Sequence, residues 1–205
     1  MRSYLKHTPR IIFFTLAFLL LIFGSRYVIQ TWNRVIKSNE DNALKLAQIA
    51  QASLSLDILN KLDLNFSDLE KNEYKQIKKS LTNIKNVDSG IRFAYIYKQK
   101  NDKLYFIADS EEPNSKDYSP PGQEYTEANS EYFKPIKDDL SRISEPVVDR
   151  WGTWISVLVP ILNSNSHEVV AVFGMDYPAK YWNDEAIPHT IQACAIVGAL
   201  YLYTC

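Results

Sequence analysis

Acidic side chains occur as adjacent pairs at two places in the chain, Glu111-Glu112 and Asp138-Asp139. Two carboxylates that share a site can act as general acid and general base. Neighbours in sequence usually point apart, however, and both pairs lie in polar stretches, so we interpret them as solvated charges. The sequence contains no nucleophile elbow, phosphate-binding loop, dinucleotide fingerprint or H-E-x-x-H zinc motif. We therefore expect no enzymatic activity from this chain.

Potential metal ligands are few and scattered. The histidines are His7, His167 and His189, and both cysteines, Cys194 and Cys205, lie in the apolar C-terminal segment. None of these spacings is that of a metal site. The formal net charge is -1, from 23 basic and 24 acidic residues, so no overall positive field attracts nucleic acid. We expect no metal, no other cofactor and no nucleic-acid partner.

The stretch DRWGTWISVLVPI, Asp149–Ile161, places Arg150 and two tryptophans directly before an apolar run. Alternate side chains of a strand face the same side, so Trp154 and Ser156 are expected to share one face. A guanidinium such as that of Arg150 can hold a ligand carboxylate through two hydrogen bonds. The alternatives are that Trp154 is a core residue and that Arg150 forms a structural ion pair with Asp149 or Asp176.

Helical spacing dominates the region after the N-terminal apolar segment. Residues 31–62 contain no Gly or Pro and predict one long helix. A second helix is expected from Ser67 to about Asn86, with Ser67 and Glu70 as a capping box. The sequence DSG at residues 88–90 then breaks the chain.

The apolar period changes to that of strands after residue 90. We expect strands at 91–98, 103–110, 153–161 and 168–177, a long Pro/Ser/Glu-rich loop at 111–130, and a short helix near 128–140 that Pro135 interrupts. Pro178 is expected at the first position of an exit helix. Long helix, antiparallel strands and exit helix together predict an α+β domain.

Both ends of the chain are apolar. Residues 11–29 follow Arg2, Lys6 and Arg10, which predicts a signal-anchor with residues 1–10 in the cytoplasm. A cleaved signal peptide and a buried core helix are the alternatives. Residues 187–205 resemble a second span that is cut short, or else a buried C-terminal helix. Under the membrane interpretation, the protein lies in the plasma (inner) membrane. Residues 30–186 then form its extracytoplasmic domain.

The blocks RWGTWIS at 150–156 with Pro160-Ile161, and VAVFGMD at 170–176, resemble the last strands of extracytoplasmic Cache-type sensor domains. These are PAS-like modules of bacterial and archaeal receptors, and the resemblance covers about residues 30–186. It implies a single-Cache, ligand-sensing domain between two membrane helices that signals to a histidine kinase, a diguanylate cyclase or a chemotaxis output domain. No output domain follows the second apolar segment, so a truncated receptor, a pseudogene product and a fragment of a longer receptor are the alternatives.

The resemblance also implies where a ligand binds. An Asp at position 176 is similar to the acidic group that contacts ligand amines in related sensors, although it is also placed to cap the exit helix. The residues expected to bind the ligand are Tyr95, Tyr97, Asp109, Tyr125, Arg150, Trp154, Ser156 and Asp176. We expect the ligand to be a small amine or zwitterion and the protein to be a homodimer. The alternatives are a membrane-tethered module that binds another protein and, with no motif to support it, an extracytoplasmic enzyme.

Overall fold

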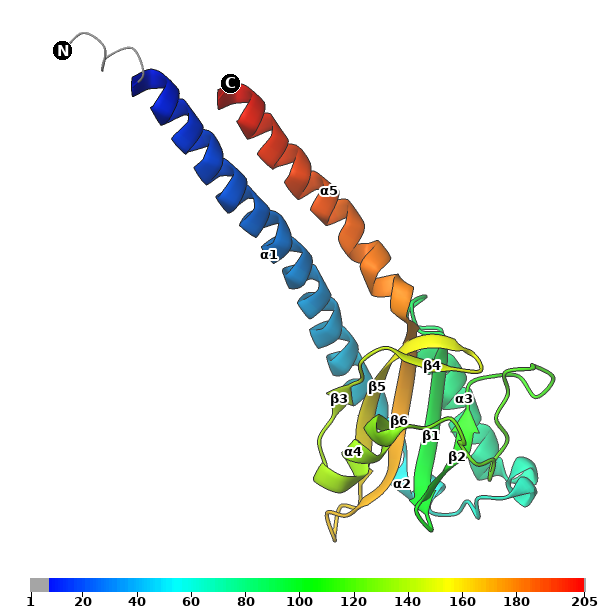
Figure 1. The fold of residues 1–205 in the computed structure, drawn as a ribbon. Helices are drawn as coiled ribbons and strands as arrows, with labels where there is room; N and C mark the ends of the chain where they lie inside the picture. The colour runs from blue at the N-terminus through cyan, green and yellow to red at the C-terminus, as the bar shows by residue number, and fades with distance from the viewer. Residues whose placement is uncertain (1–7, 205) are drawn as a thin grey trace. The chain divides into compact units, whose positions relative to one another are not determined.

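The computed structural model describes residues 8–204 and contains six helices and six strands in that range (Figure 1). The predicted cytoplasmic residues 1–7 and Cys205 lie outside the described residues. The helices are α1 (Thr8–Ala52), α2 (Leu56–Leu59), the 3-10 helix η2 (Phe66–Glu70), α3 (Asn72–Lys85), α4 (Ser130–Asp138) and α5 (Ala179–Thr204). The strands are β1 (Phe93–Lys100), β2 (Lys103–Asp109), β3 (Arg142–Ile143), β4 (Val147–Asp149), β5 (Gly152–Leu162) and β6 (Val169–Pro178).

The chain divides into two compact units, residues 40–181 and the helical ends outside them. Within the first unit the strands form one antiparallel sheet of order β2-β1-β6-β5-β3, with β4 paired to β5. The predicted α+β class with an antiparallel sheet is therefore confirmed.

Each face of the sheet buries its own set of side chains. Alternation sends Tyr95 and Tyr97 of β1 to one face, where they pack with Tyr132 of α4. Ala94 and Ile96 point to the opposite face, which α3 covers (Figure 1). The first face is therefore rich in aromatic residues, and the pocket described below lies there.

The helical predictions need two corrections. The first long helix ends at Ala52 rather than near residue 62, because Ser55 caps the separate short helix α2 by accepting a hydrogen bond from the Ile58 amide. The capping box is formed by Asn65 and Asp68, not by Ser67 and Glu70. It starts η2, and α3 begins only at Asn72.

The strand predictions hold for the four longer strands and miss the two short ones, β3 and β4. The helix near residues 128–140 is present as α4 with Pro135 inside it. Pro178 ends β6 instead of starting a helix, and α5 begins at Ala179.

The helices at the two ends of the chain, α1 and α5, are long enough and apolar enough to cross a membrane. Ile11–Ala52 and Ala179–Tyr203 contain windows of mean hydropathy 2.1 and 1.3. Within this second unit the two helices pack closely at Gly24, where an added Cβ would lie 2.5 Å from a methyl group of Val197. Two apolar helices therefore flank the unit of residues 40–181 in the sequence.

Candidate functional site

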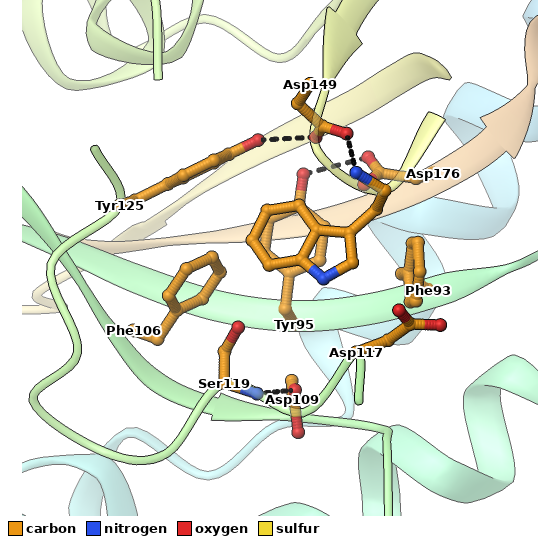
Figure 2. Close-up of a pocket in the computed structure, with 10 residues that line it drawn as sticks. Phe93, Tyr95, Phe106, Asp109, Asp117, Ser119, Tyr125, Asp149 and Asp176 are labelled. Carbon is orange, nitrogen blue, oxygen red and sulfur yellow. Dashed lines mark hydrogen bonds between the residues drawn. The ribbon is translucent and has the colours of Figure 1, made fainter. Parts of the chain in front are cut away.

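A pocket lies on the aromatic face of the sheet, under the long loop that follows β2 (Figure 2). Five aromatic residues line it: Phe93, Tyr95, Phe106, Tyr125 and Trp151. The other lining residues are Ser119 and four aspartates: Asp109, Asp117, Asp149 and Asp176. Its free volume is about 30 Å³, which is room for about two water molecules.

Asp176 is placed by the register of β1 and β6. Tyr95 pairs with Gly174, and Asp176 lies two residues further along the same face. Gly174 leaves the surface of β6 flat, since an added Cβ would lie 2.5 Å from the Tyr95 ring. The ring therefore crosses β6, and its hydroxyl donates a hydrogen bond of 2.8 Å to Asp176 Oδ1 (Figure 2).

The surroundings of Asp176 are dry. Its relative exposure is 4%, and its cross-strand neighbours are Phe93 on β1 and Ser156 on β5. Burial raises the pKa of Asp176 to about 7, while hydrogen bonds from Ser156 and Tyr95 favour the charged form and nearby Asp149 disfavours it. Asp176 is a residue of β6, and its carboxylate accepts a hydrogen bond from the Tyr95 hydroxyl. The interpretation of Asp176 as a helix cap is therefore wrong.

Asp149 organises the turn between β4 and β5. Its Oδ1 accepts hydrogen bonds from the amides of Trp151 (2.8 Å) and Gly152 (3.0 Å) and from Trp154 Nε1 (2.9 Å). Tyr125 donates a longer bond of 3.4 Å to Oδ2. These contacts hold the Trp151 ring over the pocket, where it packs edge-on against Phe93, Phe106 and Tyr125.

Asp109 closes the opposite end of the pocket. Its Oδ2 accepts a 2.6 Å hydrogen bond from the Ser119 amide, and its Oδ1 lies 3.3 Å from Lys78 Nζ of α3. Burial raises the pKa of Asp109 to about 6, against the opposing effects of the Ser119 amide and Lys78. Lys78 also donates to the backbone carbonyl oxygens of Asp109 and Glu111, so its ammonium group joins α3 to the end of β2 and to the start of the long loop.

A network of ion pairs adjoins this end. Arg92 pairs with Glu111 at 2.7 Å and with Asp117 at 2.8 Å, and Lys85 pairs with Glu111 at 2.6 Å. Although burial raises the pKa of Glu111, these two cations lower it below its usual value overall. Glu111 is therefore a buried ion-pair partner, whereas Glu112 is exposed as predicted.

The structure brings four of the eight expected site residues to the pocket wall: Tyr95, Asp109, Tyr125 and Asp176. Three others form the layer around it. Tyr97 donates to the Tyr132 carbonyl oxygen (2.8 Å), Ser156 hydrogen-bonds the Tyr132 hydroxyl (3.0 Å), and Trp154 packs against Phe93 at 5.1 Å.

Arg150 lies outside the pocket. Its side chain is 51% exposed, pairs with Glu127 at 3.2 Å and stacks on Trp151 at 4.0 Å. The expected structural ion pair with Asp149 or Asp176 is therefore formed with Glu127 instead.

Sequence reasoning did not select Asp149, Asp117, Ser119 or Phe106 for the pocket. Asp117 and Ser119 lie in the long loop, where no periodicity shows which way a side chain points. Asp149 gives one signal in the sequence, because an Asp two residues before a Trp-Gly pair is a common start of a tight turn.

Comparisons of sequence find no matching protein-family model and no matching curated protein. Comparisons of structure do find relatives in fold. The ligand-binding domain of the Campylobacter jejuni chemoreceptor Tlp3 in complex with L-norvaline matches with a TM-score of 0.57 and 13% identity, over 84% of this chain and 63% of that one. The same domain in complex with 4-methylisoleucine gives a TM-score of 0.55 and 12% identity, over 82% and 62%.

The chain shares the fold of this ligand-binding domain. The periplasmic sensory domain of C. jejuni Tlp1 is also found, with a TM-score of 0.44 and 15% identity over 80% of this chain and 61% of that one. The chain thus spans less than two thirds of the length of these domains. The predicted PAS-like architecture is confirmed at the level of fold.

Proposed function

We propose that residues 30–186 form the extracytoplasmic, small-ligand-binding domain of a membrane receptor. The observation that carries this proposal is the pocket itself, in which aromatic walls and buried carboxylates converge on one face of a sensor-type sheet. Pockets of this kind, mostly apolar with a few placed polar groups, are typical of small-molecule sites. The expected ligand is a small amine or zwitterion.

The two apolar helices support a membrane location. Residues 11–29 and 187–205 are proposed to span the membrane, with the basic N-terminal flank in the cytoplasm. The protein is proposed to act as a homodimer along α1, where Ile49 is 70% exposed. Ligand binding would shift the populations of two helix arrangements and signal to a cytoplasmic output of the two-component or cyclic-di-GMP type.

The alternative is a membrane-tethered module that binds another protein. An exposed aromatic patch would favour it, yet five aromatic residues of the sheet lie in the pocket wall or in the layer around it: Phe93, Tyr95, Tyr97, Phe106 and Trp154. The burial of these rings favours a small-molecule sensor.

A thermal-shift screen of the full chain in detergent or lipid nanodiscs tests the proposal, using amino acids, amines, carboxylates and nucleosides. A ligand at one hundred times its Kd stabilises the folded state by about 2.7 kcal/mol, so a true ligand raises the midpoint by several degrees. The Asp176→Asn variant should lose that shift. A folded protein that responds to none of these classes would contradict the sensor function.

A further inference from the structure

We infer that the pocket takes an alkylated ammonium ion, tertiary or quaternary, that carries no carboxylate. This ligand class rests on the proposed sensor function and narrows it. Three features of the pocket lead to it: the sign of the lining charges, the hydrogen bonds that the carboxylates already accept, and the number of aromatic rings.

The lining charges are all negative. Among the described residues, the charged side chains of the pocket wall are Asp109, Asp117, Asp149 and Asp176. The basic groups around the pocket already have partners: Lys78 pairs with Asp109, Arg92 with Glu111 and Asp117, and Arg150, outside the pocket, with Glu127. A ligand carboxylate would therefore meet like charges and no available cation, which is unfavourable in a dry site.

The two ends of the pocket differ in net charge. Asp109 and Asp117 each have a basic partner, whereas Asp149 and Asp176 form no ion pair with any described residue. Figure 2 shows Asp149 and Asp176 together at one end of the pocket and Asp109 and Asp117 at the other. A single positive charge near Asp149 and Asp176 would reduce the excess negative charge at this end.

Of the two carboxylates at this end, that of Asp149 has little capacity for further hydrogen bonds. Asp149 Oδ1 already accepts three N–H groups, and its Oδ2 accepts the Tyr125 hydroxyl. Asp176 Oδ1 accepts the Tyr95 hydroxyl. A primary ammonium has three N–H donors to satisfy on leaving water, while a quaternary ammonium has none and needs only the charge.

The rings supply what an alkylated ammonium requires. The side chains of Phe93, Tyr95, Phe106, Tyr125 and Trp151 line the pocket, and Figure 2 shows the first four of them around it. Aromatic faces attract cations, and enclosures of several rings recognise quaternary ammonium groups. N-methyl groups also bury apolar surface against such walls, which a primary ammonium does not.

Trp151 is the wall best placed to move when a ligand binds, because the pocket as it stands has room for about two water molecules. Tyr95, Phe93 and Phe106 are fixed on the paired strands β1 and β2. Trp151 instead is only half-buried, on the turn held by Asp149, with the Arg150 guanidinium on its ring. A ligand that displaces this indole will change its fluorescence.

Two matched comparisons test the inference on the full chain in nanodiscs, by tryptophan fluorescence and calorimetry. Choline and ethanolamine differ in the N-methyl groups, and choline and glycine betaine differ chiefly in the carboxylate. We expect choline to bind at least tenfold more tightly than either. Equal affinity for ethanolamine, or equal affinity for betaine, would overturn the inference and leave the sensor function standing.

Variants locate the site. Asp176→Asn and Trp151→Leu should each weaken choline binding at least tenfold, while Trp151→Phe should keep most of it. Asp139→Asn is the matched control, because it removes the same charge at an exposed position where the backbone is left-handed, a conformation that Asn accepts. Binding by none of the three probes, or choline binding that survives both first variants, would also overturn the inference. The broader thermal-shift screen then decides separately whether the protein is a sensor.

Discussion

At the scale of single residues, Gly174 is the position on which the site geometry depends most directly. A Cβ at this residue would lie 2.5 Å from the buried Tyr95 ring and 2.8 Å from its hydroxyl oxygen. We predict that Gly174→Ala displaces the ring, breaks the bond to Asp176 and lowers the free energy of unfolding by about 1–3 kcal/mol. Thermal unfolding measures the loss.

Gly198→Ala is the control, because an added Cβ there meets no atom within 4 Å. Its unfolding midpoint should stay close to that of the wild type. A Gly174→Ala variant with an unchanged midpoint would show that the Tyr95 ring does not depend on the missing Cβ.

Asp176 makes the stability of the domain depend on pH. Its pKa is about 7 in the folded state, against 3.8 in an unperturbed side chain. The folded state therefore binds more protons between these values, and the free energy of unfolding falls as the pH rises from about 4 to 7. The full effect is on the order of 2–4 kcal/mol.

We therefore predict that Asp176→Asn is more stable than the wild type at pH 8, and that the difference shrinks toward pH 5. Midpoints of thermal unfolding across this range measure it. The other titratable groups near Asp176 are retained in both proteins: Tyr95, Tyr97, Tyr125, Tyr132 and Asp149. A difference that is constant with pH would mean that Asp176 does not ionise in this range.

At the scale of elements, α3 is joined to the pocket by Lys78, which bonds to Asp109 and to the start of the long loop. Tyr74, one turn earlier, hydrogen-bonds the Tyr118 hydroxyl of the same loop at 2.8 Å. Removing one partner of a buried ion pair leaves the other charge uncompensated. We predict that Lys78→Met destabilises the protein by about 3 kcal/mol at pH 8.

The loss should be smaller below about pH 6, because Asp109 is then protonated in both proteins. Adding Asp109→Asn to Lys78→Met should recover part of the stability at pH 8. The control is Lys79→Met, which changes an exposed neighbour on the same helix. If Lys78→Met and Lys79→Met lower the free energy of unfolding equally in chemical denaturation, Lys78 does not stabilise the contact between α3 and Asp109.

The elements also show how far the sequence determines the fold. Period-two alternation identified the four longer strands, since each has enough residues to display it. β3 and β4 have two and three residues, too few for any period. The end of α1 was missed because residues 53–59 keep an apolar spacing compatible with a helix, and only the Ser55 cap reveals the break.

The pocket was predictable only in part, since Tyr125 of the long loop was expected there and Phe106 of β2 was not. Tyr95 and Asp176 followed from strand alternation and from the family resemblance. Asp149 is held toward the pocket by three N–H groups within five residues of it, a local turn that strand alternation alone does not indicate. The role of Lys78 could not be predicted, because its partner Asp109 lies 31 positions away in the sequence, at the end of β2.

At the scale of the whole molecule, the proposed function requires residues 30–186 to lie outside the cytoplasm. The turn between β5 and β6 offers a reporter position, because Ser166 lies in an exposed turn closed by a hydrogen bond from the His167 amide to the Asn163 carbonyl oxygen. We predict that Ser166→Cys, in a background with Cys194 and Cys205 changed to Ser, is labelled by a membrane-impermeant maleimide in intact spheroplasts. Ser3→Cys, in the segment predicted to be cytoplasmic, should react only after lysis.

Labelling of Ser3→Cys in intact spheroplasts with protection of Ser166→Cys would reverse the orientation. The pocket would then face the cytoplasm, where an external ligand has no access to it.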